Sequence, residues 1–320
     1  MSLASASTQK GSPQAIKADR LAGLVLEVGD LEATRAFYDP IFRTHPGEWV
    51  KHEASLTYRT ATEAITFARR RLPRTFPSGG HHQGYRVPRG SVRRVTEELV
   101  AAGHTVDWWR EDHPHEQLPA PYLHDPSGNR VQLVGADGGD ALLDHVAIEV
   151  YEFDYCEYLY VTSLCGAVDY YYGWRSDDRD DAKLMGAGDD PCAPWTRRDN
   201  PHYRDFLVED PVTHDLRPAR FGEQFGVEVP NRQMRITRPN GQVYLRYGPT
   251  RLVMISATKV RQEPREEQVK GTPRLVFTTE VDASSAAQYL KTTVNSFRRN
   301  GRNIYLRDAD GNFSELICRE

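Results

Sequence analysis

Apolar and polar residues alternate along four stretches of the chain, and this alternation predicts half-buried β-strands. The four stretches are residues 21–28, 81–87, 143–150 and 274–281. Each is followed by a segment whose apolar residues recur with helical spacing, over residues 31–42, 91–102, 153–164 and 284–294. The pattern therefore predicts four strand–helix–strands units that follow one another along the chain.

The chain also repeats itself in sequence, which supports interpreting these units as copies of one another. Residues 122–133, YLHDPSGNRVQL, recur as residues 305–316, YLRDADGNFSEL, with six of twelve positions identical at an offset of 183. In both copies a strand ends at Asp and a Gly-Asn turn leads into the next strand. A second echo, at an offset of 122, pairs residues 21–28 with residues 143–150.

Composition limits what such a chain can do. Its 320 residues suit two domains of roughly 100–200 residues each, and a hydrophobic fraction of 39% supplies enough apolar material for their cores. The net charge of −4 argues against a nucleic-acid or membrane-surface binder. Residues 1–19 are polar and predict a disordered tail instead of a signal peptide. Four cysteines without CxxC spacing, in a chain with no long apolar run, favour a cytoplasmic protein.

With these units in view, the chain resembles the vicinal-oxygen-chelate superfamily of glyoxalases, bleomycin-resistance proteins and extradiol dioxygenases. The resemblance rests on the strand LDHVAIEV at residues 143–150 and on the closing motif YLRDADGNFSEL at residues 305–316. The four-unit layout is most similar to that of the catechol 2,3-dioxygenase-type enzymes. It implies an α+β fold of four tandem βαβββ modules paired into two half-open barrels, an N-terminal one over residues 20–136 and a C-terminal one over residues 141–320.

In that superfamily a divalent metal lies inside a barrel, bound by residues of the first and last strands of the modules. Carried over to this chain, the resemblance implies His145 and Glu315 as metal ligands and Tyr305 as a catalytic residue. The position of the second ligand histidine holds Arg274, and a guanidinium has no lone pair to offer a metal. The plainer alternatives are a buried histidine bonded to a neighbour and a tyrosine at the barrel rim.

Arg274 leaves two metal-free alternatives open. It forms a buried ion pair with Glu315, since an ionised carboxylate in a barrel interior needs a partner, or it binds a carboxylate or phosphate of a substrate through two hydrogen bonds. In the N-terminal half the equivalent ligand positions hold Gly23, His82 and Gln132. Because these provide two donors only, this half is expected to be a structural barrel.

A polar insert in the third module covers residues 175–231 and is expected to form a lid over the second barrel. It contains His202 and His214, the histidines available as a further metal donor. Just before it, Tyr172 and Trp174 are expected to line the pocket and bind a flat substrate, although alternate rings on a strand also pack into a core.

The resulting functional expectation is a dioxygenase-like oxidoreductase or lyase that acts on a small oxygenated, aromatic substrate in the C-terminal barrel. Its cofactor would be Fe(II), Mn(II), Zn(II) or Ni(II), acting as a Lewis acid or activating O₂, and no motif for a nucleotide cofactor is present. The alternative is a metal-free protein that binds or sequesters a small molecule, as in the bleomycin-resistance branch. No nucleic acid or membrane is expected as a partner, and a homodimer is left open.

Overall fold

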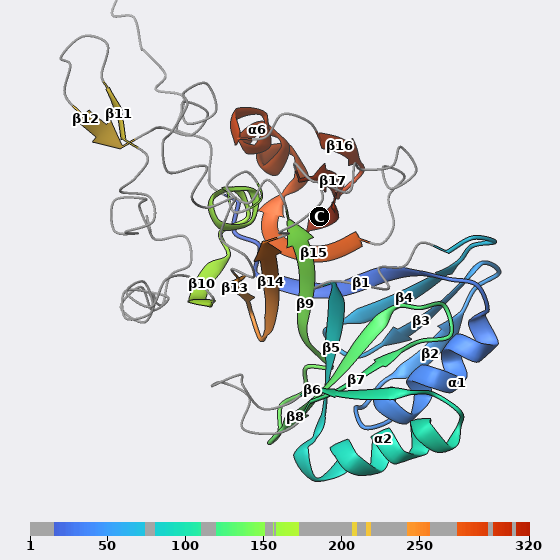
Figure 1. Ribbon diagram of the computed structural model, residues 1–320. Coiled ribbons are helices and arrows are strands. Elements are labelled where there is room, and N and C mark those ends of the chain that lie inside the picture. Colours follow the sequence, from blue (N-terminus) through green and yellow to red (C-terminus); the bar gives the residue numbers. More distant parts are fainter. Residues whose placement is uncertain are drawn as a thin grey trace, which may run out of the picture.

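A computed structural model arranges the chain as two mixed β-sheets flanked by helices (Figure 1). It describes residues 16–73, 81–109, 120–150, 156, 158–172, 207–209, 216–218, 242–256, 274–293, 297–308 and 312–320. No helix within these ranges is long and apolar enough to cross a membrane. The α+β fold class and the four successive modules are confirmed.

Modules 1 and 2 have the complete order of elements. Module 1 consists of β1 (Arg20–Val28), α1 (Leu31–Phe42), β2 (Glu48–Lys51), β3 (Ser55–Arg59) and β4 (Ala64–Arg69). Module 2 consists of β5 (His82–Pro88), the 3₁₀ turn η1 (Arg89–Ser91), α2 (Val92–Ala101), β6 (Val106–Trp109), β7 (Ala120–His124) and β8 (Arg130–Ala136). Helix α1 begins where the carboxylate of Asp30 accepts the backbone N–H groups of Glu32 and Ala33.

Modules 3 and 4 repeat this order, with an insert in module 3. Module 3 consists of β9 (Leu143–Val150), the π-helical turn η2 (Tyr158–Ser163), β10 (Ala167–Tyr172), β13 (Gln242–Tyr247) and β14 (Thr250–Ser256). Module 4 consists of β15 (Arg274–Asp282), α6 (Ala283–Thr293), β16 (Phe297–Asn300), β17 (Asn303–Arg307) and β18 (Phe313–Arg319). Of the expected lid over residues 175–231, the described part is the two-stranded sheet of β11 (Leu207–Glu209) and β12 (Leu216–Pro218).

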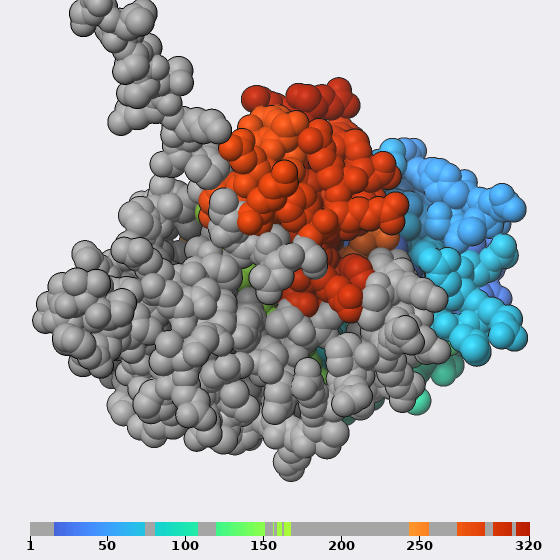
Figure 2. All heavy atoms as spheres, turned by 90° about the horizontal axis from the view of Figure 1, so that it is seen from above, coloured from blue at the N-terminus to red at the C-terminus, as the bar shows by residue number. Residues whose placement is uncertain are grey.

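The strand order corrects the expected pairing of the modules. One sheet runs β16-β17-β18-β15-β1-β4-β3-β2, and the other runs β10-β13-β14-β9-β5-β8-β7-β6. Modules 1 and 4 form the first sheet, in which β1 pairs with β15, and we call it the 1–4 sheet. Modules 2 and 3 form the second, in which β5 pairs with β9, and we call it the 2–3 sheet. Figure 2 accordingly shows the orange and red C-terminal residues beside the blue N-terminal ones.

The physical reason for this difference lies in what periodicity can reveal. Alternation identifies a strand and its buried face, but it does not say which strand lies at its edge. Residues 20–136 and residues 141–320 therefore each contribute strands to both sheets, instead of each forming a barrel alone.

Modules 1 and 2 nevertheless contact each other through the repeated Gly-Asn turn, as do modules 3 and 4. Tyr38 of α1 donates a hydrogen bond to Asp125 at 3.1 Å, and Tyr160 of η2 donates one to Asp308 at 3.2 Å. The tyrosines are separated by the offset of 122 and the aspartates by the offset of 183. In both turns the carboxylate also accepts the backbone N–H of the Asn four residues later. The contact is therefore duplicated together with the sequence.

Removing either turn carboxylate should destabilise the fold. We expect Asp125→Ala and Asp308→Ala each to lower the free energy of unfolding by about 2–3 kcal/mol, because several hydrogen bonds to a buried charged group are lost. Urea unfolding followed by circular dichroism measures the change. Asp137→Ala is the control, since the ion pair of Asp137 with Arg89 is exposed and should contribute little to stability. Losses as small as that of the control would contradict the expectation.

Residues 16–19, which the sequence places in a disordered tail, lie against β15. Ile16 and Ala18 are buried, and the backbone N–H of Asp19 donates to the carbonyl of Thr278 at 2.8 Å. The tail expectation is corrected for these four residues, because two apolar side chains at alternate positions gain from burial on the sheet.

Candidate functional site

Polar side chains gather on one face of the 2–3 sheet, where β5, β8 and β9 lie side by side. Gly84 of β5 pairs with His145 of β9 on one side and with Gln132 of β8 on the other. Paired residues of neighbouring strands point to the same face, and His82 shares it because it lies two residues before Gly84. His82, Gln132 and His145 therefore face the same side, and Gln132 and His145 are buried.

The imidazoles of His82 and His145 meet over Gly84. Their Nε2 atoms are 2.9 Å apart, and their rings are nearly perpendicular, with an interplanar angle of 85°. A Cβ at position 84 would collide with the ring of His145, so this approach requires glycine. At 2.9 Å one Nε2 must accept a hydrogen bond, and at least one of the two rings is therefore neutral.

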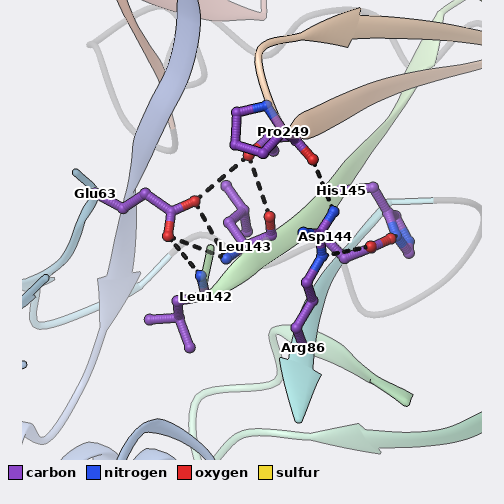
Figure 3. Close-up of polar contacts among 8 residues, drawn as sticks. Glu63, Arg86, Leu142, Leu143, Asp144, His145 and Pro249 are labelled. Carbon is purple, nitrogen blue, oxygen red and sulfur yellow. Dashed lines mark hydrogen bonds and ion pairs between the residues drawn. The ribbon is translucent and has the colours of Figure 1, made fainter. Parts of the chain in front are cut away.

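Asp144 bonds His145 on the Nδ1 side of its ring, and Arg86 bonds Asp144 in turn (Figure 3). Its Nδ1 lies 2.9 Å from Oδ2 of Asp144, and Nε of Arg86 donates to Oδ1 of Asp144 at 2.9 Å. Adjacent residues of a regular strand point to opposite faces, but Asp144 is the extra residue of a β-bulge opposite Gly84, and a bulge re-aims a side chain. Arg86 is fixed in turn, because its Nη2 donates to the carbonyl of Pro249 at 2.7 Å.

The environment of Asp144 holds the pKa of its carboxyl well below the usual range. Burial alone would raise this pKa, but the hydrogen bond and charge of His145, together with the charge of Arg86, outweigh burial. Asp144 is therefore ionised at neutral pH and accepts a proton from Nδ1 of His145. When His145 is neutral, this hydrogen bond leaves its lone pair on Nε2, facing His82.

An aromatic ring and a cation border the pair on the β7–β8 side. Tyr122 lies edge-on to His82, with ring centroids 5.3 Å apart, and the guanidinium of Arg130 lies 4.4 Å from the centroid of the Tyr122 ring. Tyr122 pairs with Gln132 across β7 and β8, so it faces the same side. A molecule bound at the histidines would therefore have a ring and a positive charge beside it.

The equivalent region of the 1–4 sheet holds an ion pair. Nε of Arg274 donates to Oε2 of Glu315 at 2.7 Å, and Nδ2 of Asn303 donates to Oε1 at 2.7 Å. The side chain of Glu315 is 7% exposed and that of Arg274 is 27% exposed, so the carboxylate is buried with both oxygens bonded. Tyr305 pairs with Glu315 across β17 and β18 and faces the same side. Of the alternatives for Arg274, the structure contains the ion pair with Glu315.

The structure thus separates residues that the sequence places in one site. Arg274, Tyr305 and Glu315 lie in the 1–4 sheet, whereas His145 lies in the 2–3 sheet. This arrangement gives no support to a metal shared by His145 and Glu315, because that metal required modules 3 and 4 to form one barrel. Tyr172 ends β10 in the 2–3 sheet, and only its backbone position is described. Outside the described residues lie Trp174, His202 and His214.

His82 and Gln132 can be found from the sequence as ligand-equivalent positions, although their half of the chain is expected to be structural. Asp144 and Arg86 are not predicted from the sequence. The available signal for Asp144 is its place beside His145 in an Asp-His dipeptide, whereas Arg86 reaches the site only because β5 pairs with β9, which periodicity does not reveal.

The His82–His145 pair offers two imidazole nitrogens as donors to a divalent metal. Their Nε2 atoms lie 2.9 Å apart, on the face that the two rings share with Gln132. Imidazole suits Zn, Cu, Fe and Ni, and a carboxylate behind the ring, here Asp144, is the usual support of a metal-bound histidine. Among the described residues no three His, Cys, Asp or Glu side chains are arranged so that all of them could hold one metal ion. The described donor set is therefore two imidazoles with the amide of Gln132 on the same face.

Comparison with known proteins establishes the fold. No family model and no curated protein matches the sequence. Among solved structures, glyoxalase I from Zea mays matches with a TM-score of 0.56 at 13% identity, over 93% of this chain and 92% of that chain. A protein of Bacillus subtilis subsp. subtilis str. 168 with a provisional dioxygenase designation matches with a TM-score of 0.54 at 11% identity, over 95% and 86% of the two chains. The chain therefore has the fold of the vicinal-oxygen-chelate superfamily.

Proposed function

We propose that the chain is a metal-dependent enzyme acting on a small oxygenated molecule, and that its active site is the face of the 2–3 sheet with His82, Gln132 and His145. The observation that carries the proposal is the 2.9 Å approach of the two Nε2 atoms, with Asp144 bonded behind His145. Three features position the imidazole of His145: Gly84 leaves room for the ring, the bulge of β9 turns Asp144 toward it, and the buried carboxylate of Asp144 bonds it. A histidine that only fills a core needs none of the three.

In this proposal His82 and His145 hold the metal and Gln132 adds its amide oxygen. When bound, the metal supplies Lewis acidity toward oxygens of the substrate. Asp144 keeps His145 in the tautomer whose Nε2 is free of a proton, and Arg86 keeps Asp144 in place. The chain's own residues thus prepare the site by fixing one ring nitrogen.

The charge of the described donor set indicates the class of substrate. Two imidazoles and an amide are neutral, so they leave the full positive charge of a divalent ion uncompensated. Arg130 adds a further positive charge beside Tyr122. Both features favour a substrate that carries or develops negative charge on its oxygens. The set also differs from the two-histidine, one-carboxylate set of non-haem Fe(II) oxygenases, so we favour Lewis-acid chemistry over activation of O₂.

Metal stoichiometry tests the proposal. Protein prepared without an affinity tag is titrated with Co(II) in a calorimeter, and we expect one metal per chain, because the equivalent region of the 1–4 sheet holds the Arg274–Glu315 ion pair. Two metals per chain would contradict the assignment to a single sheet. No binding of Co(II), Zn(II) or Ni(II) would instead favour the metal-free alternative, a protein that binds a small molecule without transforming it.

A further inference from the structure

Glu63 is a buried carboxylate in the turn between β3 and β4, and its side chain reaches out of the 1–4 sheet. It is 3% exposed, and burial raises its pKa, opposed by the hydrogen bonds that it accepts. The turn is held by Thr60, whose Oγ1 accepts the backbone N–H of Glu63 at 3.0 Å and whose own N–H donates to the carbonyl of Glu63 at 3.0 Å. The carboxylate is therefore presented from a fixed position.

Among the described residues, the carboxylate of Glu63 bonds to the segments that begin β9 and β14, in the 2–3 sheet (Figure 3). The backbone N–H of Leu142 donates to it at 2.6 Å and that of Leu143 at 3.3 Å. The hydroxyl of Thr250, at the start of β14, lies 3.4 Å from the carboxylate and 3.1 Å from the carbonyl of Leu143. Glu63 thus binds the two residues that directly precede Asp144.

Those two residues lead into the bulge of β9, and the bulge occurs twice in the fold. In β9 the extra residue is Asp144, and in β1, 122 positions earlier, the extra residue is Ala22. The bulge is therefore a shared feature of both sheets, but only the β9 copy carries an Asp-His pair. A bulge interrupts the ladder of backbone hydrogen bonds, and Glu63 accepts N–H groups at this interruption.

We propose that Glu63 is a positioning residue for His145, because it holds the bulge that turns Asp144 toward the imidazole. The inference rests on the proposed function, since it assigns Glu63 to the same site. Without the carboxylate, the N–H groups of Leu142 and Leu143 lose their acceptor, and a shift of the strand toward a regular ladder is the simplest way to bond them. In a regular ladder Asp144 would point away from the face of His145.

Two measurements on Glu63→Ala test this role. In the metal-bound state we expect its affinity for Co(II) to fall about 10–100-fold, as for other residues that support a metal ligand. In the metal-free protein at neutral pH we expect the ¹⁵N shifts of the His145 ring to show loss of the Nδ1-protonated tautomer. Glu63→Gln keeps an acceptor oxygen for Leu142 and should restore most of both properties.

Asp308→Ala is the matched control, because Asp308 is also a buried carboxylate that accepts a backbone N–H, but in the turn after β17 of the 1–4 sheet. It should lower stability and leave the affinity for Co(II) and the tautomer of His145 unchanged. The role of Glu63 is overturned if Glu63→Ala changes neither property, or if Asp308→Ala changes both as much. If the wild-type protein binds no Co(II), the proposed function fails, and the tautomer still decides whether Glu63 positions His145.

Discussion

Replacing His82 or His145 with alanine is expected to lower the affinity for Co(II) more than about 100-fold, beyond the loss that follows removal of a supporting residue. Each substitution removes one of the two imidazoles whose Nε2 atoms are 2.9 Å apart, and a single imidazole with an amide oxygen holds a divalent ion weakly. Calorimetric titration of both variants gives the dissociation constants. Turnover of a substrate, once one is found, should fall in parallel, because in the proposed function the same ion would polarise it.

His52→Ala is the control for these variants, since His52 is an exposed histidine near the edge of the 1–4 sheet. It should bind Co(II) as the wild-type protein does. Circular dichroism establishes that each variant is folded. A folded His82→Ala protein with unchanged affinity would remove His82 from the site, and equal losses in His52→Ala would point to nonspecific binding.

Arg274→Ala should destabilise the protein by about 3 kcal/mol, the lower end of the cost of breaking a buried ion pair. The substitution leaves the carboxylate of Glu315, with 7% of its side chain exposed, without its cation, and of the described side chains Asn303 still bonds it. We place the effect at the lower end because 27% of the Arg274 side chain is exposed. Urea unfolding measures the change in the free energy of unfolding.

Two further variants separate the ion pair from other effects of Arg274. Arg302→Ala removes an exposed pair with Glu320 and should cost less than about 1 kcal/mol. Arg274→Met combined with Glu315→Leu removes both charges and should cost less than Arg274→Ala alone, because no uncompensated carboxylate remains. A cost below about 1 kcal/mol for Arg274→Ala would speak against a structural pair, and substrate binding by Arg274 would then be the better hypothesis.

The local architecture of this chain can be predicted from its sequence because each module is built on short-range patterns. Alternation locates the first strands of the four modules, helical spacing locates α1 at Leu31–Phe42, and the repeated Gly-Asn motif locates the closing turns. The pairing of the modules cannot be predicted in this way. β1 and β15 are joined by backbone hydrogen bonds although they lie about 250 residues apart in the sequence. No local pattern in either strand identifies the other as its partner.

For the candidate site, too, local patterns predict individual residues but not which of them lie together. His145 and its ligand-equivalent positions His82 and Gln132 can be found from the repeat, because each module places a donor at the same point of its first or last strand. Which of these donors share a site depends on the pairing of the modules, and the expected partner Glu315 consequently lies in the other sheet. Asp144 acts through a bulge, and a bulge leaves no mark in an alternating pattern.

The crossed arrangement of the sheets also sets the order in which the chain can fold during synthesis. β5 and β9 begin about 60 residues apart, so the strands that carry the histidines can pair soon after both have left the ribosome. β1 can pair with β15 only after about 250 further residues have been synthesised, which takes about 10–50 s at a synthesis rate of about 5–20 residues per second. During that time one edge of β1 has no partner, and an open strand edge is a site of aggregation. The histidine face can therefore form while the other half of the fold still depends on protection from other chains.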